Sequence, residues 1–445
     1  MTRFEHDVVG VGIGPFNLGL AALLDGVDEL DARFFDGKPQ FAWHPGLMLD
    51  EAEVQVPFLA DLVTLADPTS PYSFLAYLHA RGRLYRFYFH EQLHVLRREF
   101  DAYYRWVSQR LASCSFGARV TEVAAAPAGG WSVRLEDGAE HRARAVVLGV
   151  GGVPVVPDCA RPLCGDDVVH TADYAGARER ALRAARVTVL GSGQSAAEVV
   201  ADVLDHAPAA RLDWFTRSAG FLPMEYSKLG LEHFSPEYVA HFHGLPEERR
   251  DALRAGQDLL YKGIAAETSA RIFDALYRRS IDGAEPNAGY AARCELRELG
   301  RSAGGALRLV LHHLDEDVSF THETDVLVLG TGYRDAPLPV PALAELAVLD
   351  AHGRPVIEAD FRVRLRDGAG ERALFVQNAE LHSHGVGAPD LGLGAHRNAV
   401  IVNALCGREV YAVRERNVFQ TFGAPGGAGA AARTGGSGAG GIHAA

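Results

Sequence analysis

The chain has 445 residues, of which 48% are hydrophobic and 23% charged, so it is long enough for two or three domains with buried cores. Its formal net charge of −13 argues against nucleic-acid binding, which requires a basic surface. Five cysteines without CxxC or zinc-type spacing indicate reduced thiols, as in a cytoplasmic protein. We expect neither a signal peptide nor an integral membrane segment, because no apolar run is long enough to span a bilayer.

Hydrophobic patterning predicts an α/β protein that contains two strand–helix–strand units. The first unit covers residues 6–36, with strands at 6–11 and 32–35. The second begins at Val187, and its next strand covers 212–215. Further strands are expected at 131–135, 145–148, 307–312, 326–329 and 374–376, and helices within 72–111, 236–280 and 398–405.

A glycine-rich loop follows the first predicted strand and opens a helix. Gly12 and Gly14 occupy the first two positions of a dinucleotide-binding fingerprint, where small residues let the backbone approach a pyrophosphate. Asn17 stands where a third glycine is common. Asp36 ends the next strand, at the place where an acidic side chain binds ribose hydroxyls. These features predict a bound dinucleotide, and the alternative is a glycine turn in a domain that binds none.

A second loop of the same kind is built on Gly191, Gly193 and Ala196. Here the following strand leads to Arg217 instead of an acid, which suits the 2′-phosphate of NADP, although an ordinary surface arginine is the alternative. Two dinucleotides in one chain indicate hydride transfer from a nicotinamide to a flavin. We therefore predict FAD on the first unit and NADPH on the second.

The predicted fold has two Rossmann-like dinucleotide-binding domains and a smaller helical substrate lobe. The FAD-binding domain is expected to cover residues 1–165 and 331–422. The NADPH-binding domain is expected to cover 166–330, including a helical lobe at about 220–285. The glycine-rich residues 423–445 are expected to form a disordered tail.

Five motifs carry a family resemblance. They are GxGPFNL at the first loop, FAWHPGLMLDEAEVQVPFL, DLVTLADPTSPYSFLAYL, GSGQSAAE at the second loop, and DVLVLGTGY at 325–333. Together they resemble the microbial N-hydroxylating flavoprotein monooxygenases, which include the L-ornithine N5- and L-lysine N6-monooxygenases of siderophore biosynthesis. The resemblance runs from about Val8 to Arg408.

This resemblance implies a reaction. NADPH reduces FAD, oxygen adds to the flavin to give a C4a-hydroperoxide, and a neutral primary amine takes the distal oxygen to become a hydroxylamine. The protein supplies placement and a dry pocket for this cofactor chemistry. A homotetramer is also implied.

Residue roles are implied by the matched motifs. Gln55 and His44 are the implied catalytic groups beside the flavin and NADP, and Trp43 lies along the flavin or packs in the core. His384 matches a turn near the flavin, and we expect no metal there because no acid or cysteine completes a ligand set with His382. The cofactor-binding residues are Gly12, Gly14, Pro15, Asn17, Asp36, Trp43, Gly191, Gly193, Gln194, Ser195, Arg217, Thr331, Gly332 and Tyr333.

Two departures from the amino-acid hydroxylases change the predicted substrate. Ala60 replaces the family's lysine that pairs with the substrate α-carboxylate, and Gly392 replaces a serine that touches the same end. A buried carboxylate without a cation costs about 3–5 kcal/mol. We therefore predict a diamine substrate, putrescine or cadaverine, for hydroxamate siderophore biosynthesis. If Lys262 captures the carboxylate instead, the substrate is L-lysine or L-ornithine.

A diamine also needs a partner for its far ammonium group. Asp390 is the preferred carboxylate, because it lies close in sequence to the second departure, and Glu225 and Glu232 are the alternatives. Backbone carbonyls or water could serve the same purpose.

Two functions of other classes remain as alternatives. A flavin disulfide reductase would need a redox cysteine pair, and Cys159 and Cys164 are the candidates close in sequence. A non-catalytic dinucleotide sensor would bind the nucleotides without oxidising NADPH.

Overall fold

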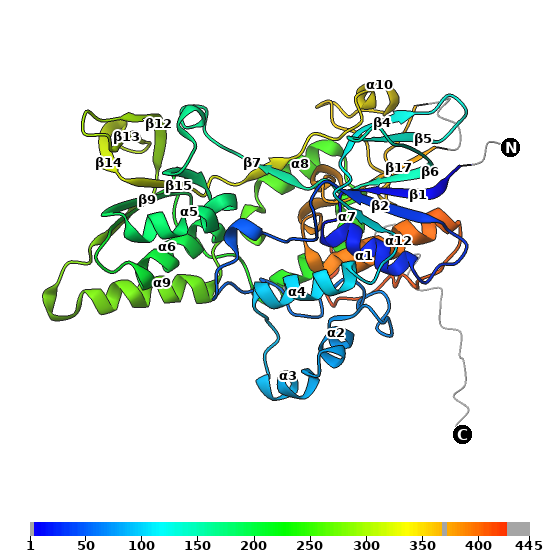
Figure 1. Cartoon of the computed structure of the whole chain (residues 1–445), viewed down its shortest axis with the longest axis horizontal. Coiled ribbons are helices and arrows are strands. Elements are labelled where there is room, and N and C mark those ends of the chain that lie inside the picture. Colours follow the sequence, from blue (N-terminus) through cyan, green and yellow to red (C-terminus); the bar gives the residue numbers. More distant parts are fainter. Residues whose placement is uncertain (1–3, 367–371, 425–445) are drawn as a thin grey trace.

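The computed structural model describes residues 4–366 and 372–424. It contains two parallel or mostly parallel sheets, which lie at opposite ends of the long axis of the molecule (Figure 1). Most of the predicted tail, residues 425–445, lies outside the described residues. Within the described ranges, no helix is long and apolar enough to cross a membrane.

The first sheet belongs to the predicted FAD-binding domain. Its strand order is β3-β2-β1-β6-β5-β4, and β17 pairs with the second half of β6. β1, β2, β3, β6 and β17 run parallel, while β4, β5 and β6 are joined as antiparallel neighbours. The bounds are β1 His6–Val11, β2 Ala32–Asp36, β3 Cys114–Phe116, β4 Val120–Ala125, β5 Trp131–Leu135, β6 Glu140–Leu148 and β17 Ala373–Val376.

Helices cover this sheet because their apolar residues pack on it. α1 and α12 lie against each other and share one core with α4. The bounds are α1 Pro15–Leu24, α4 Arg97–Ser108 and α12 Gly394–Cys406. The predicted helical stretch 72–111 is in fact three helices, with α2 Phe74–Ala80 and α3 Leu84–His90 before α4. Gly82, which has a φ of +65°, separates the first two of them.

The second sheet is parallel throughout, in the order β11-β10-β9-β15-β8. Its strands are β8 Val168–His170, β9 Arg186–Leu190, β10 Arg211–Phe215, β11 Ala288–Ala291 and β15 Val326–Leu329. α5 Tyr174–Arg183, α6 Gln194–His206 and α9 Ala266–Arg279 share its core on one side. A smaller antiparallel sheet, β12 Cys294–Arg301, β13 Leu307–His313 and β14 Val318–Thr324, shares a core with its other face.

A short antiparallel pair connects the two sheets. β7 (Gly152–Pro154) pairs with β16 (Tyr333–Asp335), so the chain leaves the first domain and returns to it at the same place. Residues 325–333, which carry the DVLVLGTGY motif, run from the second sheet back toward the first. Thr331 fixes this crossing by donating its hydroxyl to the Val155 carbonyl.

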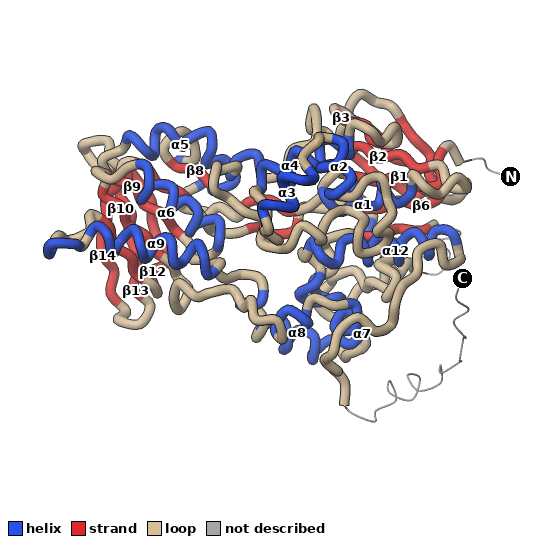
Figure 2. The backbone as a smooth tube through the Cα atoms, turned by 90° about the horizontal axis from the view of Figure 1, so that it is seen from below, coloured by secondary structure: helices blue, strands red, loops and turns tan. Residues whose placement is uncertain are grey.

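The predicted helical lobe at 220–285 divides between two surfaces. α9 packs on α6 of the second domain, whereas α7 (Pro236–His243) and α8 (Glu247–Ala255) pack on the 381–387 segment of the first (Figure 2). An apolar cluster of Tyr238, Phe242 and Val386 forms this second contact. The lobe therefore bridges the domains, which helical periodicity alone could not reveal.

Candidate active site

The first glycine loop has the geometry that a pyrophosphate needs. Gly12 has a φ of +85°, and a Cβ there would lie 2.5 Å from the Gly149 carbonyl oxygen. A Cβ on Gly14 would meet no atom within 4 Å, so open space lies in front of the loop. Pro15 begins α1 directly behind it, where its missing N–H costs nothing. The residues present therefore fit a dinucleotide phosphate at the free N–H groups of this helix end.

Asn17 has a structural reason to replace the third glycine. Its buried side chain donates to the carbonyl oxygens of Gly12 and Val11, at 2.8 and 3.2 Å, and accepts from Gln377 Nε2 at 2.8 Å. These bonds tie the loop to β1 and to the residue after β17. A Cβ on Gly149 would lie 2.7 Å from the Asn17 amide, so that glycine makes room for the larger residue.

Asp36 lies at the carboxyl end of β2, beside the same loop. Its two oxygens accept the backbone N–H groups of Ile13, at 2.7 Å, and Lys38, at 2.8 Å. The carboxylate is therefore fixed in place before any ribose arrives, and ribose binding by Asp36 stays a prediction.

The second loop repeats the tight backbone approach. Gly191 has a φ of +129°, and a Cβ there would lie 2.0 Å from the Gly330 carbonyl oxygen. Gly193 caps α6, and Ser195 lies in the first helical turn, where backbone N–H groups are free. Gln194 has a partly structural role, since its amide contacts Glu198, Thr268 and the Ala265 N–H. Arg217 is exposed just beyond β10, which suits a 2′-phosphate contact.

His44 occupies an unusual backbone conformation in the WHPG loop, with φ and ψ both at 47°. The residue has an exposed surface, but protein atoms enclose most of its imidazole ring. Desolvation of the ring is the main cause that lowers its pKa to about 4, and the charge of Arg97 is the second. His44 is therefore neutral near pH 7. Trp43 packs edge-on against Tyr104 and near Phe100, which favours the core-packing interpretation of this residue.

The WHPG loop also touches the second domain. A Cβ on Gly46 would lie 1.5 Å from the Ala172 carbonyl oxygen, so only glycine allows this approach. Beside it, Arg97 of α4 binds Glu198 of α6 through two bonds of 2.7 and 3.0 Å, and also donates to the Leu47 carbonyl at 2.8 Å. This buried ion pair joins α6, which follows the second glycine loop, to α4 and the WHPG loop.

The structure brings together the three residues behind the substrate prediction. A Cβ at position 392 would lie 3.9 Å from Ala60 Cβ and 2.9 Å from Asp390 Oδ1. Burial raises the pKa of Asp390 to about 6, and the N–H groups of Leu393 and Gly392 partly offset this rise. Ala60 and Gly392, two small residues, therefore lie beside a desolvated carboxylate.

The other substrate candidates have different partners. The Lys262 ammonium pairs with Asp258 at 2.8 Å, and its backbone lies near Gly193 of the second loop. Glu232 accepts the N–H groups of Phe419 and Gln420 and so holds the C-terminal segment. Glu225, an exposed carboxylate, accepts the N–H of Ser227.

Gln55 is bonded through its backbone to Tyr226 of a distant segment. The backbone carbonyl oxygen of Gln55 accepts a hydrogen bond from the Tyr226 hydroxyl at 2.9 Å. The same hydroxyl lies 2.7 Å from His94 Nε2. Desolvation raises the pKa of Tyr226, and the charges of Glu267 and Asp390 add to this rise. Tyr226 thus joins Gln55 to His94, and the sequence did not single it out.

A second buried ion pair, Arg397 with Glu380, lies near Asp390 and was not predicted from the sequence. Arg397 of α12 lies 3.0 Å from Glu380, donates to the Gly387 and Ala388 carbonyls, and covers the Phe16 ring at 4.6 Å. Arg397 is the only Lys, Arg, Asp or Glu on a mostly apolar helix, and this was the available signal. Through its bonds to the Gly387 and Ala388 carbonyls, Arg397 holds the 385–393 segment in place.

The residues considered for other chemistries have ordinary partners. His382 contacts the Pro355 carbonyl, and the His384 ring stacks on Phe361. Cys159 and Cys164 are free thiols whose pKa values are raised by desolvation, the opposite of what an activated thiolate requires.

Comparison with known proteins agrees with this geometry. The family described as L-lysine 6-monooxygenase/L-ornithine 5-monooxygenase matches residues 5–335. A rhizobactin siderophore biosynthesis protein of Rhizobium meliloti is 46% identical over 95% of this chain and 96% of its own length. A putrescine N-hydroxylase of Shewanella oneidensis is 39% identical, covering 94% of this chain and 84% of its own.

A solved structure is similar over nearly the whole chain. It is that of the FAD-bound cadaverine monooxygenase of the desferrioxamine pathway from Erwinia amylovora, with 39% identity and a TM-score of 0.89 over 95% of this chain and 99% of that one. The chain belongs to the L-lysine 6-monooxygenase/L-ornithine 5-monooxygenase family.

Proposed function

We propose that this chain is an FAD- and NADPH-dependent monooxygenase that N-hydroxylates a short aliphatic diamine, putrescine or cadaverine, for hydroxamate siderophore biosynthesis. The observation that carries the substrate is the Ala60–Gly392–Asp390 cluster, in which alanine and glycine stand where the resemblance implies a lysine and a serine, beside a buried carboxylate. The names of two relatives, a putrescine N-hydroxylase and a cadaverine monooxygenase, support it.

The cofactor sites follow from the two loops. Gly12, Gly14 and Asp36 would hold FAD, and Gly191, Gly193 and Arg217 would hold NADPH. Bound FAD, once reduced by NADPH, supplies oxygen activation. The protein positions the amine, keeps it neutral and excludes water.

Direct comparison of substrates tests this proposal. NADPH oxidation and hydroxylamine formation should be measured together with putrescine, cadaverine, L-lysine and L-ornithine. We expect coupled turnover with a diamine and little with either amino acid. A preference for L-lysine or L-ornithine would restore the amino-acid hydroxylase, and no NADPH oxidation at all would indicate a sensor.

Asp390→Asn tests the ammonium partner. Asparagine keeps the size and the N-cap of the Leu391–Leu393 turn but removes the charge. We expect the KM for the diamine to rise roughly 30-fold, the loss of about 2 kcal/mol from one charged hydrogen bond. Glu225→Gln is the matched control and should leave KM unchanged. An unaltered KM in Asp390→Asn would assign the ammonium to another group.

The pH dependence of kcat/KM gives an independent check. Burial raises the pKa of Asp390 to about 6, so its side chain is negatively charged above that pH. The negative charge, and with it the partner of the ammonium, is lost as the pH falls through 6. We expect kcat/KM for the diamine to fall below about pH 6 with an inflection that Asp390→Asn removes. Retention of the inflection in the variant would place it on another group.

The homotetramer stays a prediction, and α3 is the surface on which to test it. This helix buries no residue and exposes three aromatic side chains, Tyr85, Tyr88 and Phe89. Exposed apolar patches of this kind mark interfaces between proteins. We expect light scattering to give a tetramer for the native chain and a smaller species for Tyr88→Glu. A monomer in both would reject the assembly.

A further inference from the structure

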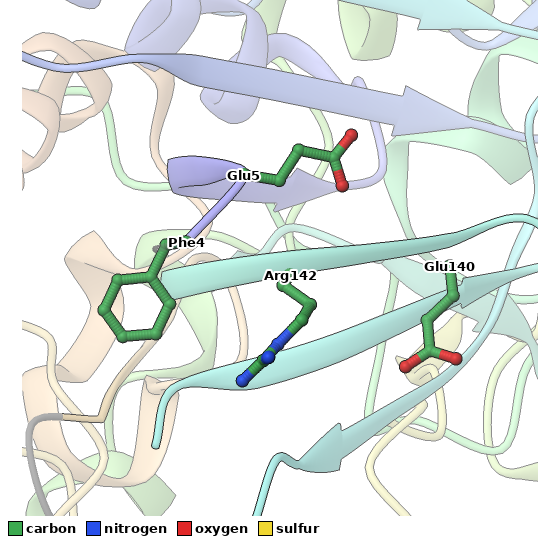
Figure 3. Close-up of a pocket in the computed structure, with 4 residues that line it drawn as sticks. All are labelled: Phe4, Glu5, Glu140 and Arg142. Carbon is green, nitrogen blue, oxygen red and sulfur yellow. The ribbon is translucent and has the colours of Figure 1, made fainter. Parts of the chain in front are cut away.

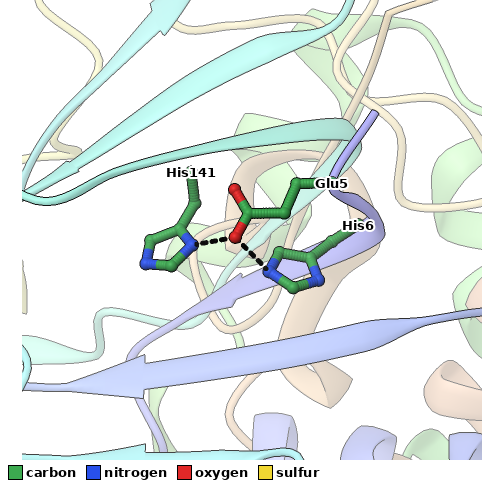
Figure 4. A group of neighbouring side chains, drawn as sticks. All are labelled: Glu5, His6 and His141. Atoms are coloured by element: carbon green, nitrogen blue, oxygen red, sulfur yellow. Dashed lines mark hydrogen bonds and ion pairs between the residues drawn. The ribbon is translucent and has the colours of Figure 1, made fainter. Parts of the chain in front are cut away.

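A cluster of metal-ligand side chains lies at the end of the first sheet that is remote from the glycine loop. Glu5, His6 and His141 meet where β1 and β6 begin (Figure 4). These strands are parallel, and the glycine loop follows the opposite end of β1. The cluster therefore belongs to neither cofactor site.

Its dimensions match a zinc site. Glu5 Oε1 lies 3.0 Å from His141 Nδ1 and 3.5 Å from His6 Nε2, and one donor atom from each residue lies within 4.8 Å of the others. Tetrahedral zinc with bonds of about 2.0–2.1 Å places its donors roughly 3.3 Å apart. Two imidazoles and one carboxylate form a donor set that zinc prefers.

The hydrogen bond on the far side of His6 fixes its tautomer. His6 Nδ1 lies 2.6 Å from Asp31 Oδ2, so the carboxylate holds the proton on that nitrogen. His6 is 9% exposed, and among the described residues its Nε2 has no hydrogen-bond partner. Nε2 therefore faces the Glu5 carboxylate at 3.5 Å, where either a second proton on the ring or a bound cation satisfies both groups. A carboxylate behind a ligating histidine is the usual outer arrangement at zinc.

Among residues 4–366 and 372–424, no lysine or arginine forms an ion pair with Glu5. Arg142 lines the same open pocket as Glu5, about 410 Å³ in volume, but its guanidinium extends away from the Glu5 carboxylate (Figure 3). The second cluster of this kind, Glu247, Asp251 and His352, differs because Arg354 pairs with both of its carboxylates. Arg354 therefore competes with a metal ion at the second cluster, whereas Arg142 points away from the first.

We propose that Glu5, His6 and His141 bind one zinc ion, with Asp31 orienting His6 and the fourth position open to solvent. The ion would clamp the chain just before β1 to the start of β6. This site is independent of the monooxygenase function, because it lies at the other end of the sheet.

Zinc titration of the chelator-treated, FAD-loaded protein tests the proposal. We expect one zinc per chain by calorimetry, with at least tenfold weaker binding in His141→Asn and in Glu5→Gln. Cobalt at the same site should give the visible absorption of a four-coordinate ion. His312→Asn, a histidine of similar exposure on β13, is the matched control and should bind zinc like the native protein. Both test residues are partly exposed, so neither substitution threatens folding.

Three results would overturn the site. They are the absence of a zinc stoichiometry near one in the native protein, unchanged affinity in both test variants, and an equal loss in His312→Asn. Coupled hydroxylation should persist in His141→Asn, so failure of the zinc site and failure of the proposed function are distinguished.

Discussion

Replacing Ala60 by lysine is expected to lower kcat/KM for a diamine by roughly 100-fold, equivalent to about 3 kcal/mol. Ala60 is buried, and its Cβ lies beside position 392, which in turn borders Asp390. A lysine at 60 would reach the Asp390 carboxylate and pair with it. The far ammonium of a diamine would then lose its anion and meet a like charge in its place.

The charge and the size of the new side chain must be separated. Ala60→Met adds similar length without charge, and we expect it to cost less than tenfold. Ala60→Lys should also narrow the preference for diamines over L-lysine or L-ornithine, because the new ammonium can meet an α-carboxylate. Equal losses in the lysine and methionine variants would show that volume alone matters here. Steady-state kinetics with coupled detection of hydroxylamine provides all these values.

The parts of the site that the sequence could predict are those encoded locally. Gly12 and Gly191 were recognised because positive φ and close backbone approach admit only glycine, and both properties are present in the structure. Family motifs then placed Ala60 and Gly392, which are distant in sequence, on the same end of the substrate. Their proximity in space agrees with that assignment.

The parts that could not be predicted depend on partners from distant segments. Arg97 lies on the same helix face as Phe100 and Tyr104, so its burial was detectable, but its partner Glu198 belongs to the other domain. The helical lobe was predicted as one unit because periodicity reports helices and not the surface on which each one packs. Tyr226 was missed because it lies outside any helix or strand and acts through side-chain contacts alone.

Arg97→Met is expected to lower the free energy of unfolding by about 3–5 kcal/mol, the largest effect on stability that we predict. The substitution would leave the Glu198 carboxylate buried beside Gln194 without its cation. Removing both charges with Arg97→Met and Glu198→Leu should recover most of this loss, since an apolar pair of similar volume replaces a buried ion pair at little cost. Thermal unfolding of the FAD-loaded protein measures both effects. Arg178→Met is the matched control, because Arg178 of α5 is partly exposed and pairs with Asp202, which like Glu198 belongs to α6.

The double variant separates stability from alignment of the two domains. Arg97 also holds the Leu47 carbonyl, so it connects the WHPG loop with α6, the helix that follows the second glycine loop. If this connection sets how NADPH meets the flavin, the stable double variant should still oxidise NADPH yet convert a smaller fraction of it into hydroxylamine, with hydrogen peroxide as the balance. A double variant with native coupling would show that the pair stabilises the protein without aligning its cofactors. The contact of Gly46 with Ala172 and the packing of Leu47 and Leu49 in the core of the second domain would then suffice to hold the WHPG loop.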